Sequence, residues 1–362
     1  MMSMIDCKKI LIVDDSAFMR KIIGDFLQNE VWCKVVGTAR NGKEGLKKIQ
    51  ELQPDLILLD IEMPVMNGLE MLEKLMKTNP IPVIIISTLA TEGTETTIRA
   101  LELGAVDFIT KPTNIFKMNQ SDIKEAIIQK IRMASSVTST HLQRLELPGK
   151  TNIKALSTEF NQPSSISKIQ SFVAIGVSTG GPRALQQVLP LIPEDIGASF
   201  LIVQHMPPGF TKSLSDRLNQ MSQIHVKEAE DGEVLAPGVA YIAPGDYHML
   251  VEQKSSSSSQ YVIRLSMSEP VGRHRPSVDV MMESIAKLPI KNAIGVIMTG
   301  MGSDGTVGMI QLKEKLDAFT IAQDETSCVV YGMPKAAVEA GVVDEVVSLE
   351  KIAERIIKQL GV

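Results

Sequence analysis

The chain contains 362 residues, 44% of them hydrophobic, and its 37 lysines and arginines nearly balance its 42 aspartates and glutamates. This length predicts about two domains, each with enough apolar residues to form its own core. The net charge of -5 argues against nucleic-acid binding through bulk charge, and the lack of an apolar run of ~18 residues argues against a membrane span.

The three cysteines, Cys7, Cys33 and Cys328, are far apart in the sequence and lack the spacing of a metal site. They predict reduced packing thiols of the kind found in cytoplasmic proteins. The first residues run directly into an apolar segment without a signal-peptide core, so we expect a cytoplasmic protein that does not insert into a membrane.

The first half alternates short apolar runs with helical patterns up to about Arg132. Continuous apolar strands that alternate with helices are typical of a parallel sheet covered on both faces. The predicted strands are Ile10–Val13, Leu56–Leu59, Val83–Ile86 and Phe108–Thr110, and the predicted helices include Lys43–Leu52 and Gly68–Lys77. The first domain is therefore predicted to be α/β and to span residues 1–132.

Residues 133–168 break this pattern. Ser135–Thr140 and Asn161–Ser165 have the polar, proline-containing composition of linkers. Strand and helix patterns resume after residue 168. We therefore predict an interdomain linker at 133–168 and a second domain at 169–362.

The second half again alternates strands and helices, with one antiparallel insertion. The predicted strands are Phe172–Val177, Phe200–Val203, Ala293–Met298 and Phe319–Ala322, and the predicted helices are Ala184–Leu191, Asp279–Leu288 and Val307–Leu316. Gly238–Val251 and Tyr261–Leu265 predict a β-hairpin, and the serine run Ser255–Ser259 predicts its solvated turn. The second domain is therefore predicted to be a doubly wound α/β domain with a hairpin insertion.

Five polar side chains follow strands of the first domain. Asp14 and Asp15 follow the first strand, Asp60 and Ser87 follow two middle strands, and Lys111 follows the last. In a parallel sheet these positions meet at one edge. Carboxylates clustered there would bind Mg²⁺, one of them can accept a phosphoryl group, and the lysine and hydroxyl can hold its oxygens.

Each of these features has a simpler interpretation when it is taken alone. Asp14 and Asp15 could be a helix N-cap pair, and Lys111-Pro112 could be a solvated turn. All five side chains suit one chemistry and share one edge, which favours a phosphorylation site.

The first domain contains four motifs in this order: Val13–Asp15, Pro54–Pro64, Asn67-Gly68 and Lys111-Pro112. Together they resemble the receiver domain of response regulators, over Lys9 to about Arg132. The resemblance implies a flavodoxin-like fold with a five-stranded parallel sheet. It also implies that Asp60 is the phosphoacceptor beside Mg²⁺ held by the three carboxylates, and that Ser87, Phe108 and Lys111 transmit the phosphorylated state.

The second domain contains the pattern G-x-S-x-G at Gly176–Gly180. Its serine can be a nucleophile beside helix N-terminal amides, but such a turn can also bind phosphate, or the serine can cap the helix. His205 follows the next strand, and Asp304 follows a later strand within the glycine-rich loop Thr299–Gly305. Nucleophile Ser178, base His205 and orienting acid Asp304 are therefore predicted to meet at one edge. Their chain order differs from the Ser…Asp…His order of α/β-hydrolases.

His274 is the rival base, within the segment Arg273–Asp279. It follows no predicted strand end, so we assign it, with Arg273 and Arg275, to a substrate groove that attracts an acidic partner. A solvated basic turn is an alternative interpretation of the same residues.

Four motifs of the second domain stand in this order: Ile175–Pro182, Gln204–Phe210, His274–Asp279 and Thr299–Gly305. They resemble the catalytic domain of chemotaxis protein-glutamate methylesterases, over about Phe172 to Ile357. The resemblance implies the triad Ser178, His205 and Asp304, an oxyanion hole that includes the backbone amide of Met301, and a Thr179 that positions His205. The order of receiver, linker and esterase also matches that family.

The two sites together predict a phosphorylation-activated hydrolase. By resemblance, it would remove methyl esters from glutamates of methyl-accepting chemotaxis receptors, and deamidate receptor glutamines, once a chemotaxis histidine kinase has phosphorylated Asp60. Ester hydrolysis by such a triad needs no cofactor, and we expect a monomer that binds no nucleic acid. The alternative is a non-enzymatic two-component regulator whose second domain binds a nucleotide or a partner. A serine-directed phosphonate would label only the hydrolase.

Overall fold

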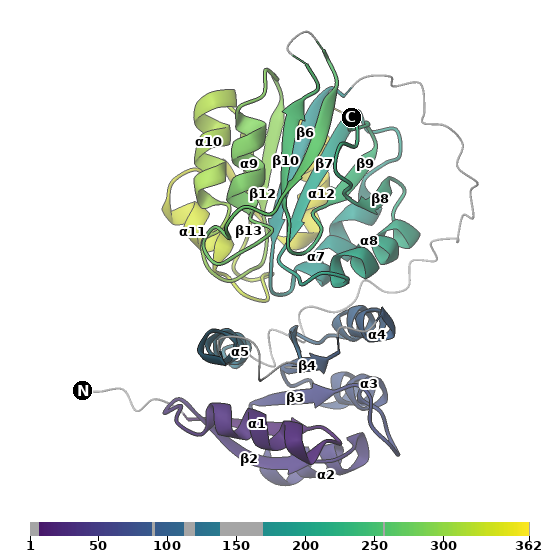
Figure 1. The fold of residues 1–362 in the computed structure, drawn as a ribbon, viewed down its shortest axis with the longest axis vertical. Helices are drawn as coiled ribbons and strands as arrows, with labels where there is room; N and C mark the ends of the chain where they lie inside the picture. The colour runs from purple at the N-terminus through teal and green to yellow at the C-terminus, as the bar shows by residue number, and fades with distance from the viewer. Residues whose placement is uncertain (1–6, 89–90, 112–119, 138–168, 256–257, 362) are drawn as a thin grey trace. The chain divides into compact units, whose positions relative to one another are not determined.

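The computed structural model describes residues 7–88, 91–111, 120–137, 169–255 and 258–361. The chain divides into two compact units, residues 1–146 and residues 147–362 (Figure 1). Most of the predicted linker 133–168, Pro112 and the centre of the serine run Ser255–Ser259 lie outside the described residues. The domain boundaries therefore stay predictions.

The first unit is built on a five-stranded parallel sheet in the order β2-β1-β3-β4-β5. Its strands are β1 (Lys8–Val13), β2 (Cys33–Ala39), β3 (Leu56–Asp60), β4 (Val83–Ser87) and β5 (Asp107–Thr110). Its helices are α1 (Ala17–Leu27), α2 (Gly42–Leu52), α3 (Gly68–Thr78), α4 (Thr91–Glu102) and α5 (Gln120–Ala134). Helix α1 packs beside α5, and α3 packs beside both α2 and α4. The apolar central strands are buried, and the predicted flavodoxin-like fold is confirmed.

The second unit is built on a seven-stranded parallel sheet in the order β14-β13-β12-β6-β7-β9-β8. Its strands are β6 (Ser171–Val177), β7 (Ala198–Gln204), β8 (His225–Glu228), β9 (Val239–Ile242), β12 (Ala293–Ile297), β13 (Phe319–Gln323) and β14 (Glu345–Val347). Its helices are α7 (Gly181–Val188), the 3-10 turn η1 (Leu189–Leu191), α8 (Phe210–Met221), α9 (Val278–Ala286), α10 (Thr306–Leu316), α11 (Met333–Glu339) and α12 (Leu349–Leu360).

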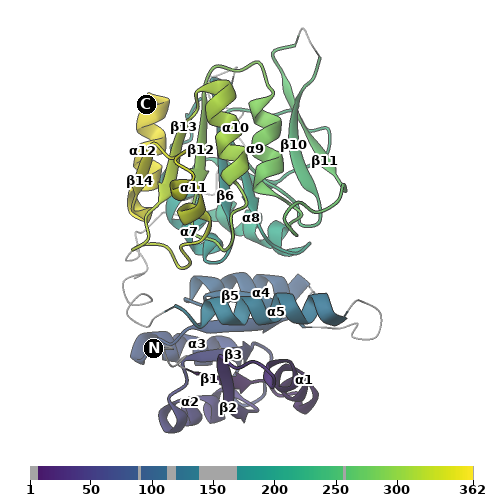
Figure 2. The same cartoon turned by 90° about the vertical axis from the view of Figure 1, so that its left-hand side faces the viewer.

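The strand order of this sheet reverses between β6 and β12. From β6 the chain adds β7, β9 and β8 on one side, and then returns to add β12, β13 and β14 on the other. Such a reversal opens a crevice at the carboxyl ends of the strands, where α/β folds bind ligands. Helices α7, α8 and α12 pack together, whereas α10 packs against both α9 and α11 (Figure 2).

The prediction of one hairpin strand at Gly238–Val251 is wrong, because this segment forms two separate strands, β9 and β10. β9 joins the main sheet beside β7, whereas β10 (His248–Gln253) pairs antiparallel with β11 (Tyr261–Ser266). Pro244 follows β9 and has no N–H to continue a ladder. A Cβ on Gly245 would lie 2.4 Å from the Pro207 carbonyl carbon, so the chain bends tightly here. The antiparallel hairpin itself is confirmed, and it packs against α9.

The described residues bear on the expected absence of a membrane span and on the expected state of the cysteines. None of their helices combines the length and the apolar character needed to cross a bilayer. Cys33 and Cys328 are buried, as predicted for packing thiols, but Cys7 is exposed and does not pack in a core.

Candidate functional site

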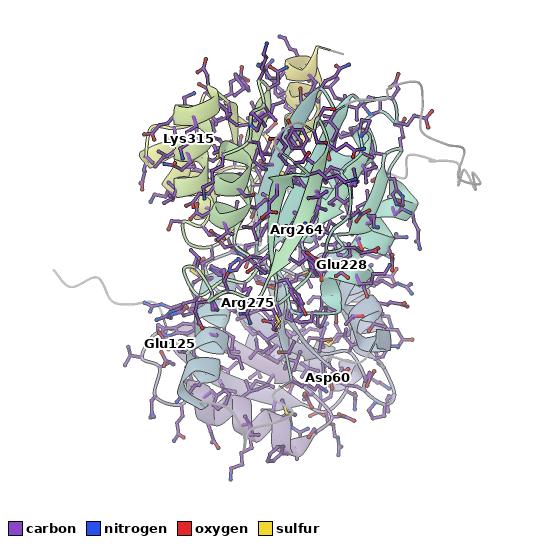
Figure 3. The ribbon with its side chains drawn as sticks, turned by 45° about the horizontal axis from the view of Figure 1, so that its top comes forward. Asp60, Glu125, Glu228, Arg264, Arg275 and Lys315 are labelled. Atoms are coloured by element: carbon purple, nitrogen blue, oxygen red, sulfur yellow. The ribbon has the colours of Figure 1, made fainter. Side chains whose placement is uncertain are left out.

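The acidic site of the first unit lies at the carboxyl edge of its sheet. Asp14 follows β1, Asp60 ends β3 and Lys111 follows β5. The Lys111 ammonium lies 2.7 Å from Asp60 Oδ2 and 3.9 Å from Asp14 Oδ2. Asp15 joins them, since one carboxylate oxygen each from Asp14, Asp15 and Asp60 lies within 4.8 Å of the others. The structure therefore brings the predicted acidic cluster together, with Asp60 labelled in Figure 3.

Burial dominates the electrostatics of this cluster. It raises the pKa of Asp60 to about 6, against the opposing hydrogen bond from Lys111 and with help from the charge of Asp14. Burial also raises the pKa of Asp14, whose Oδ2 is buried without a hydrogen-bond partner. An unsatisfied buried carboxylate oxygen is costly, and a divalent cation would satisfy it. The donor set fits Mg²⁺, which prefers carboxylate oxygens.

Ser87 connects this edge to α4. The Thr97 hydroxyl of α4 donates to Ser87 Oγ at 2.6 Å and also lies 2.7 Å from the Gly93 carbonyl oxygen. Phe108 on β5 is buried beneath the same edge. The hydroxyl predicted to sense phosphorylation is thus bonded to a helix, which can carry a change to the surface.

The Asn67-Gly68 motif allows α3 to begin close to the site. Asn67 caps α3 in a reciprocal arrangement with Glu70. A Cβ on Gly68 would lie 2.2 Å from the Asp60 carbonyl oxygen. Glycine is therefore required where α3 approaches the end of β3.

In the second unit, Ser178 occupies the turn between β6 and α7. Its amide donates to the Thr299 carbonyl oxygen at 3.0 Å, and its carbonyl oxygen accepts from the Gly181 amide at 2.8 Å. Gly180 has a φ of +78°, a left-handed conformation that disfavours a side chain. The glycines of the pattern thus shape a tight turn that leaves Ser178 half-buried at the sheet edge.

His205 follows β7, the strand beside β6, and contacts Asp304 across the edge. His205 Nε2 lies 2.7 Å from Asp304 Oδ2. The other ring nitrogen, Nδ1, is buried and has no hydrogen-bond partner. Because Asp304 accepts a hydrogen bond from Nε2–H, Nδ1 carries the lone pair and can accept a proton.

Asp304 is held as an anion by the N-terminus of α9. Its carboxylate accepts hydrogen bonds from the Ser277 hydroxyl at 2.8 Å, the Val278 amide at 2.7 Å and the Asp279 amide at 3.0 Å. Burial opposes its ionisation, but His205 and the backbone amides outweigh burial and hold the pKa of Asp304 well below its usual range. An ionised Asp304 is the state that orients a histidine base.

The loop Thr299–Gly305 passes beside Ser178. A Cβ on Gly300 would lie 2.8 Å from Ser178 Cβ. Within the described part of the chain, no group accepts a hydrogen bond from the next amide, that of Met301, so it can donate to an oxyanion. Thr179 is buried, and its carbonyl oxygen accepts from the Thr299 hydroxyl at 2.9 Å, which ties the loop to the serine turn.

His274 lies face to face with the ring of His205. The two centroids are 4.0 Å apart and the planes differ by 3°. His274 and Val271 exchange backbone hydrogen bonds of 2.9 and 3.1 Å around a tight turn. His274 thus reaches the site from a tight turn, and its ring lies against the ring of His205, the predicted base.

The two neighbouring arginines differ in their placement. The Arg275 guanidinium lies 2.7 Å from Asp246 Oδ1 and donates to the carbonyl oxygens of Met267 and Ser268. These contacts hold its own loop, where Figure 3 labels Arg275. Arg273 occupies the left-handed region with a φ of +70°. A role for either arginine in a substrate groove stays a prediction.

Three supporting residues had no role in the sequence analysis: Gln204, Ser277 and Asp279. The Gln204 amide donates to the carbonyl oxygens of Ser178 at 3.0 Å and His205 at 3.3 Å, and so bridges the two turns. Ser277 and Asp279 bond to Asp304. Gln204 stands in the motif of His205, and Ser277 and Asp279 stand in the motif His274–Asp279. Polar residues within such motifs are the signal that could have found them.

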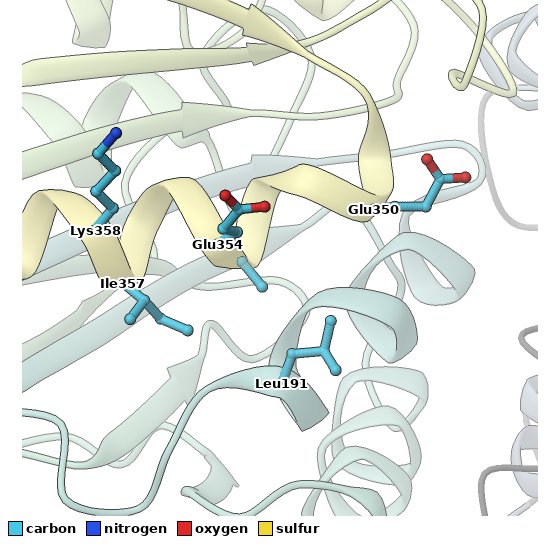
Figure 4. A pocket seen from close by; sticks show the side chains of 6 residues that line it. Leu191, Glu350, Glu354, Ile357 and Lys358 are labelled. Atoms are coloured by element: carbon cyan, nitrogen blue, oxygen red, sulfur yellow. The ribbon is translucent and has the colours of Figure 1, made fainter. Parts of the chain in front are cut away.

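A separate surface hollow lies between α12 and η1 (Figure 4). It is lined by Leu191, Glu350, Ala353, Glu354, Ile357 and Lys358. None of these residues belongs to the serine site or to the acidic site.

Comparison with known proteins divides the chain in the same way. Residues 173–356 match the family described as CheB methylesterase, and residues 10–121 match the response regulator receiver domain. The chain is 49% identical to the protein-glutamate methylesterase/protein-glutamine glutaminase of Halalkalibacterium halodurans, over 97% of this chain and 98% of that one. The Bacillus subtilis protein of the same name is 47% identical over 96% and 97%.

A solved structure also resembles the second unit. The Thermotoga maritima CheB methylesterase catalytic domain is 43% identical, with a TM-score of 0.50, and the match covers 52% of this chain and 97% of that domain.

Proposed function

The chain belongs to the CheB methylesterase family and carries a response regulator receiver domain, and from this we propose that Ser178, His205 and Asp304 carry out its hydrolysis. The relatives are protein-glutamate methylesterases and protein-glutamine glutaminases. The protein is accordingly a chemotaxis hydrolase that demethylates and deamidates chemoreceptors under control by phosphorylation. A non-enzymatic output domain is not favoured.

One observation carries the assignment of the triad. His205 bonds an ionised, buried Asp304 through Nε2, and its free Nδ1 lies at the same sheet edge as the serine turn. Folds of this kind bind ligands where the strand order reverses, which is between β6 and β12 here.

The reaction follows from these placements. Ser178 Oγ attacks the ester carbonyl carbon while His205 Nδ1 accepts the hydroxyl proton, and the Met301 amide stabilises the resulting oxyanion. The bond to the methoxy oxygen then breaks, and His205 returns the proton so that methanol leaves. Water attacks the glutamyl ester of Ser178 with the same base, which releases glutamate. When the substrate is glutamine, ammonia leaves in place of methanol.

In the first unit we propose Asp60 as the phosphoacceptor. Receiver domains use Mg²⁺ for phosphorylation and take the phosphoryl group from a histidine kinase. Asp14, Asp15 and Asp60 would hold the cation here, and its charge would favour their ionised forms. Lys111, already paired with Asp60, would bind phosphoryl oxygens.

The Ser87 hydroxyl is the proposed link to regulation. It now accepts from Thr97 of α4. It also donates to the Gly93 carbonyl oxygen of α4 at 3.2 Å. A phosphoryl oxygen on Asp60 would accept that hydrogen instead, which would loosen the tie between Ser87 and α4 and alter the surface of that helix. The monomeric state and the cytoplasmic location stay predictions.

Methanol release from methylated receptor membranes tests the function directly. The full chain should release methanol faster with a small phosphodonor and Mg²⁺ than without. Ser178→Ala should release none and should not react with a serine-directed phosphonate. If Ser178→Ala kept more than a few per cent of the activity, another residue would be the nucleophile.

A further inference from the structure

Asp279, the second residue of α9, bonds the start of the neighbouring helix α10. Its Oδ1 accepts hydrogen bonds from the Gly305 amide at 2.9 Å and the Gly308 amide at 2.7 Å. Its own amide donates to Asp304 Oδ1 at 3.0 Å. The two helices thus cap each other. Asp279 of α9 accepts from amides at the start of α10, and Asp304, just before α10, accepts from amides at the start of α9.

Helix α10 needs this partner because it has no cap of its own. Its N-cap residue is Gly305, with a φ of +98° and no side chain to accept from the first turn. A Cβ on Gly308 would lie 3.1 Å from Asp279 Cα and 2.6 Å from Met282 Cβ. Glycine at 308 therefore lets α9 approach closely enough for the Asp279 carboxylate to reach both amides.

This reciprocal capping holds Asp304, which immediately precedes Gly305, in two ways. The bond from the Gly305 amide to Asp279 fixes the peptide unit that carries Asp304. The amide of Asp279 fixes the Asp304 carboxylate itself. Burial raises the pKa of Asp279 to about 6. The amides of Gly308 and Gly305 oppose this rise, and the charge of Asp304 adds to it. The ionisation of each carboxyl therefore affects the other.

We propose that Asp279 is a positioning residue for catalysis, which holds Asp304 against His205 Nε2 without contacting substrate. This inference rests on the proposed triad. It requires that loss of the Asp279 carboxylate lowers kcat and leaves KM nearly unchanged, because only the orientation of the base is affected.

The test compares Asp279→Ala and Asp279→Asn in the phosphorylated full chain. Asp279→Ala should lower kcat about 10–100-fold, as loss of an outer partner of a functional group commonly does, with KM within about twofold. Asp279→Asn keeps an oxygen that accepts both amides, so it should recover most of the lost kcat.

Asp344→Ala is the matched control. Asp344 accepts from the Thr320 amide at 2.9 Å and the Thr320 hydroxyl at 2.8 Å, beside the edge strand β14. Its loss should lower Tm much as Asp279→Ala does, yet leave kcat within about twofold of the wild-type value.

Three results would overturn the inference: an Asp279→Ala kcat within twofold of wild type, an equal kcat loss in Asp344→Ala, or a raised KM at unchanged kcat. If Asp279→Ala does not fold, a kcat of Asp279→Asn that is lowered 10-fold or more would overturn it instead, because Asn still offers an oxygen to both amides. An active Ser178→Ala would refute the proposed function, whereas an inactive Ser178→Ala together with a fully active Asp279→Ala would refute this inference alone.

Discussion

The two histidines of the serine site differ in what holds them. His205 bonds a buried carboxylate through one ring nitrogen, whereas His274 lies against the ring face. A carboxylate in the ring plane fixes the tautomer, but a stacked ring only limits tilt. These contacts support the proposal that His205 is the base and that His274 only supports its ring.

Substitutions at these positions should fall into two classes. Asp304→Asn should keep the fold and lower methanol release about 10³–10⁴-fold, because an amide beside Nε2 favours the wrong tautomer. His274→Ala should cost only about 2–10-fold, the worth of an aromatic pair of ~0.5–1.5 kcal/mol, while His205→Ala should be inactive. Initial rates of methanol release separate the classes, and an inactive His274→Ala would make His274 the base.

Asp60 should make the stability of the first unit depend on pH. Burial raises its pKa in the folded state to about 6, above the 3.8 of an unperturbed aspartate, so the folded state binds more protons between these pH values. The contribution of Asp60 to stability is therefore fully present below about pH 3.8 and is lost as pH rises through about 6. A pKa rise of about two corresponds to roughly 3 kcal/mol.

Urea unfolding without Mg²⁺, followed by fluorescence of Trp32, measures this effect, because Trp32 is the single tryptophan and lies buried in the first unit. Asp60→Asn should remove this part of the pH dependence, and Mg²⁺ should stabilise wild type more than Asp60→Asn at pH 7. Equal pH dependence in the two proteins would show that Asp60 ionises without penalty.

At the scale of elements, the serine site is made where strands become turns. Ser178 and His205 follow adjacent parallel strands, and Gln204 ties their two carbonyl oxygens together. The loop after β12 closes the third side through Thr299, whose carbonyl oxygen accepts from the Ser178 amide. The site is therefore formed by the turns that follow β6, β7 and β12. Small residues in these turns determine how closely the turns can approach one another.

Gly181→Ala tests this packing. Its Cβ would lie 2.0 Å from Gln204 Oε1, so Gln204 must move and lose its bonds to both turns. Two hydrogen bonds of ~0.5–1.5 kcal/mol each predict a loss of activity of about 5–150-fold. Gly24→Ala in α1 is the control, because its Cβ would meet nothing within 4 Å. Matched activities of the two variants at full folding would show that Gln204 does not link the turns.

At the scale of the whole molecule, the chain holds two compact units with separate sheets. Phosphoryl chemistry belongs to one unit and hydrolysis to the other, so control requires communication between units that each have a core of their own. Interfaces between domains within one chain are commonly modest and reversible. Regulation by exposing the serine site therefore needs only a small coupling free energy.

A fragment beginning near residue 165 tests this kind of control. If the first unit limits access to the serine site, the fragment should be more active than the unphosphorylated full chain and should ignore phosphodonor. A coupling of about 1–3 kcal/mol predicts a difference of roughly 5–150-fold. Methanol release at matched concentration is the measurement, with circular dichroism as the control for folding. A folded fragment slower than the full chain would mean that the phosphorylated receiver assists catalysis.

The residue pattern alone predicts the two α/β units, which the structure confirms, and it proposes both sets of reactive residues. Apolar runs mark buried parallel strands, and the residues after them, such as Asp60 and Ser178, must gather at one edge because parallel strands share their direction. The same pattern did not predict that Gly238–Val251 divides between two sheets, since a run of strand-forming residues does not reveal which sheet each part joins.

Three contacts became visible only in the folded structure. His205 keeps Nδ1 free, His274 stacks on its ring, and Asp279 and Asp304 each accept a backbone amide from the helix start beside the other. His205 and Asp304 are 99 residues apart in the chain, and Asp279 reaches Gly305 across 26. Contacts at such separations depend on how helices pack against the sheet to within a few tenths of an ångström, and local patterns of residues carry no information at that precision.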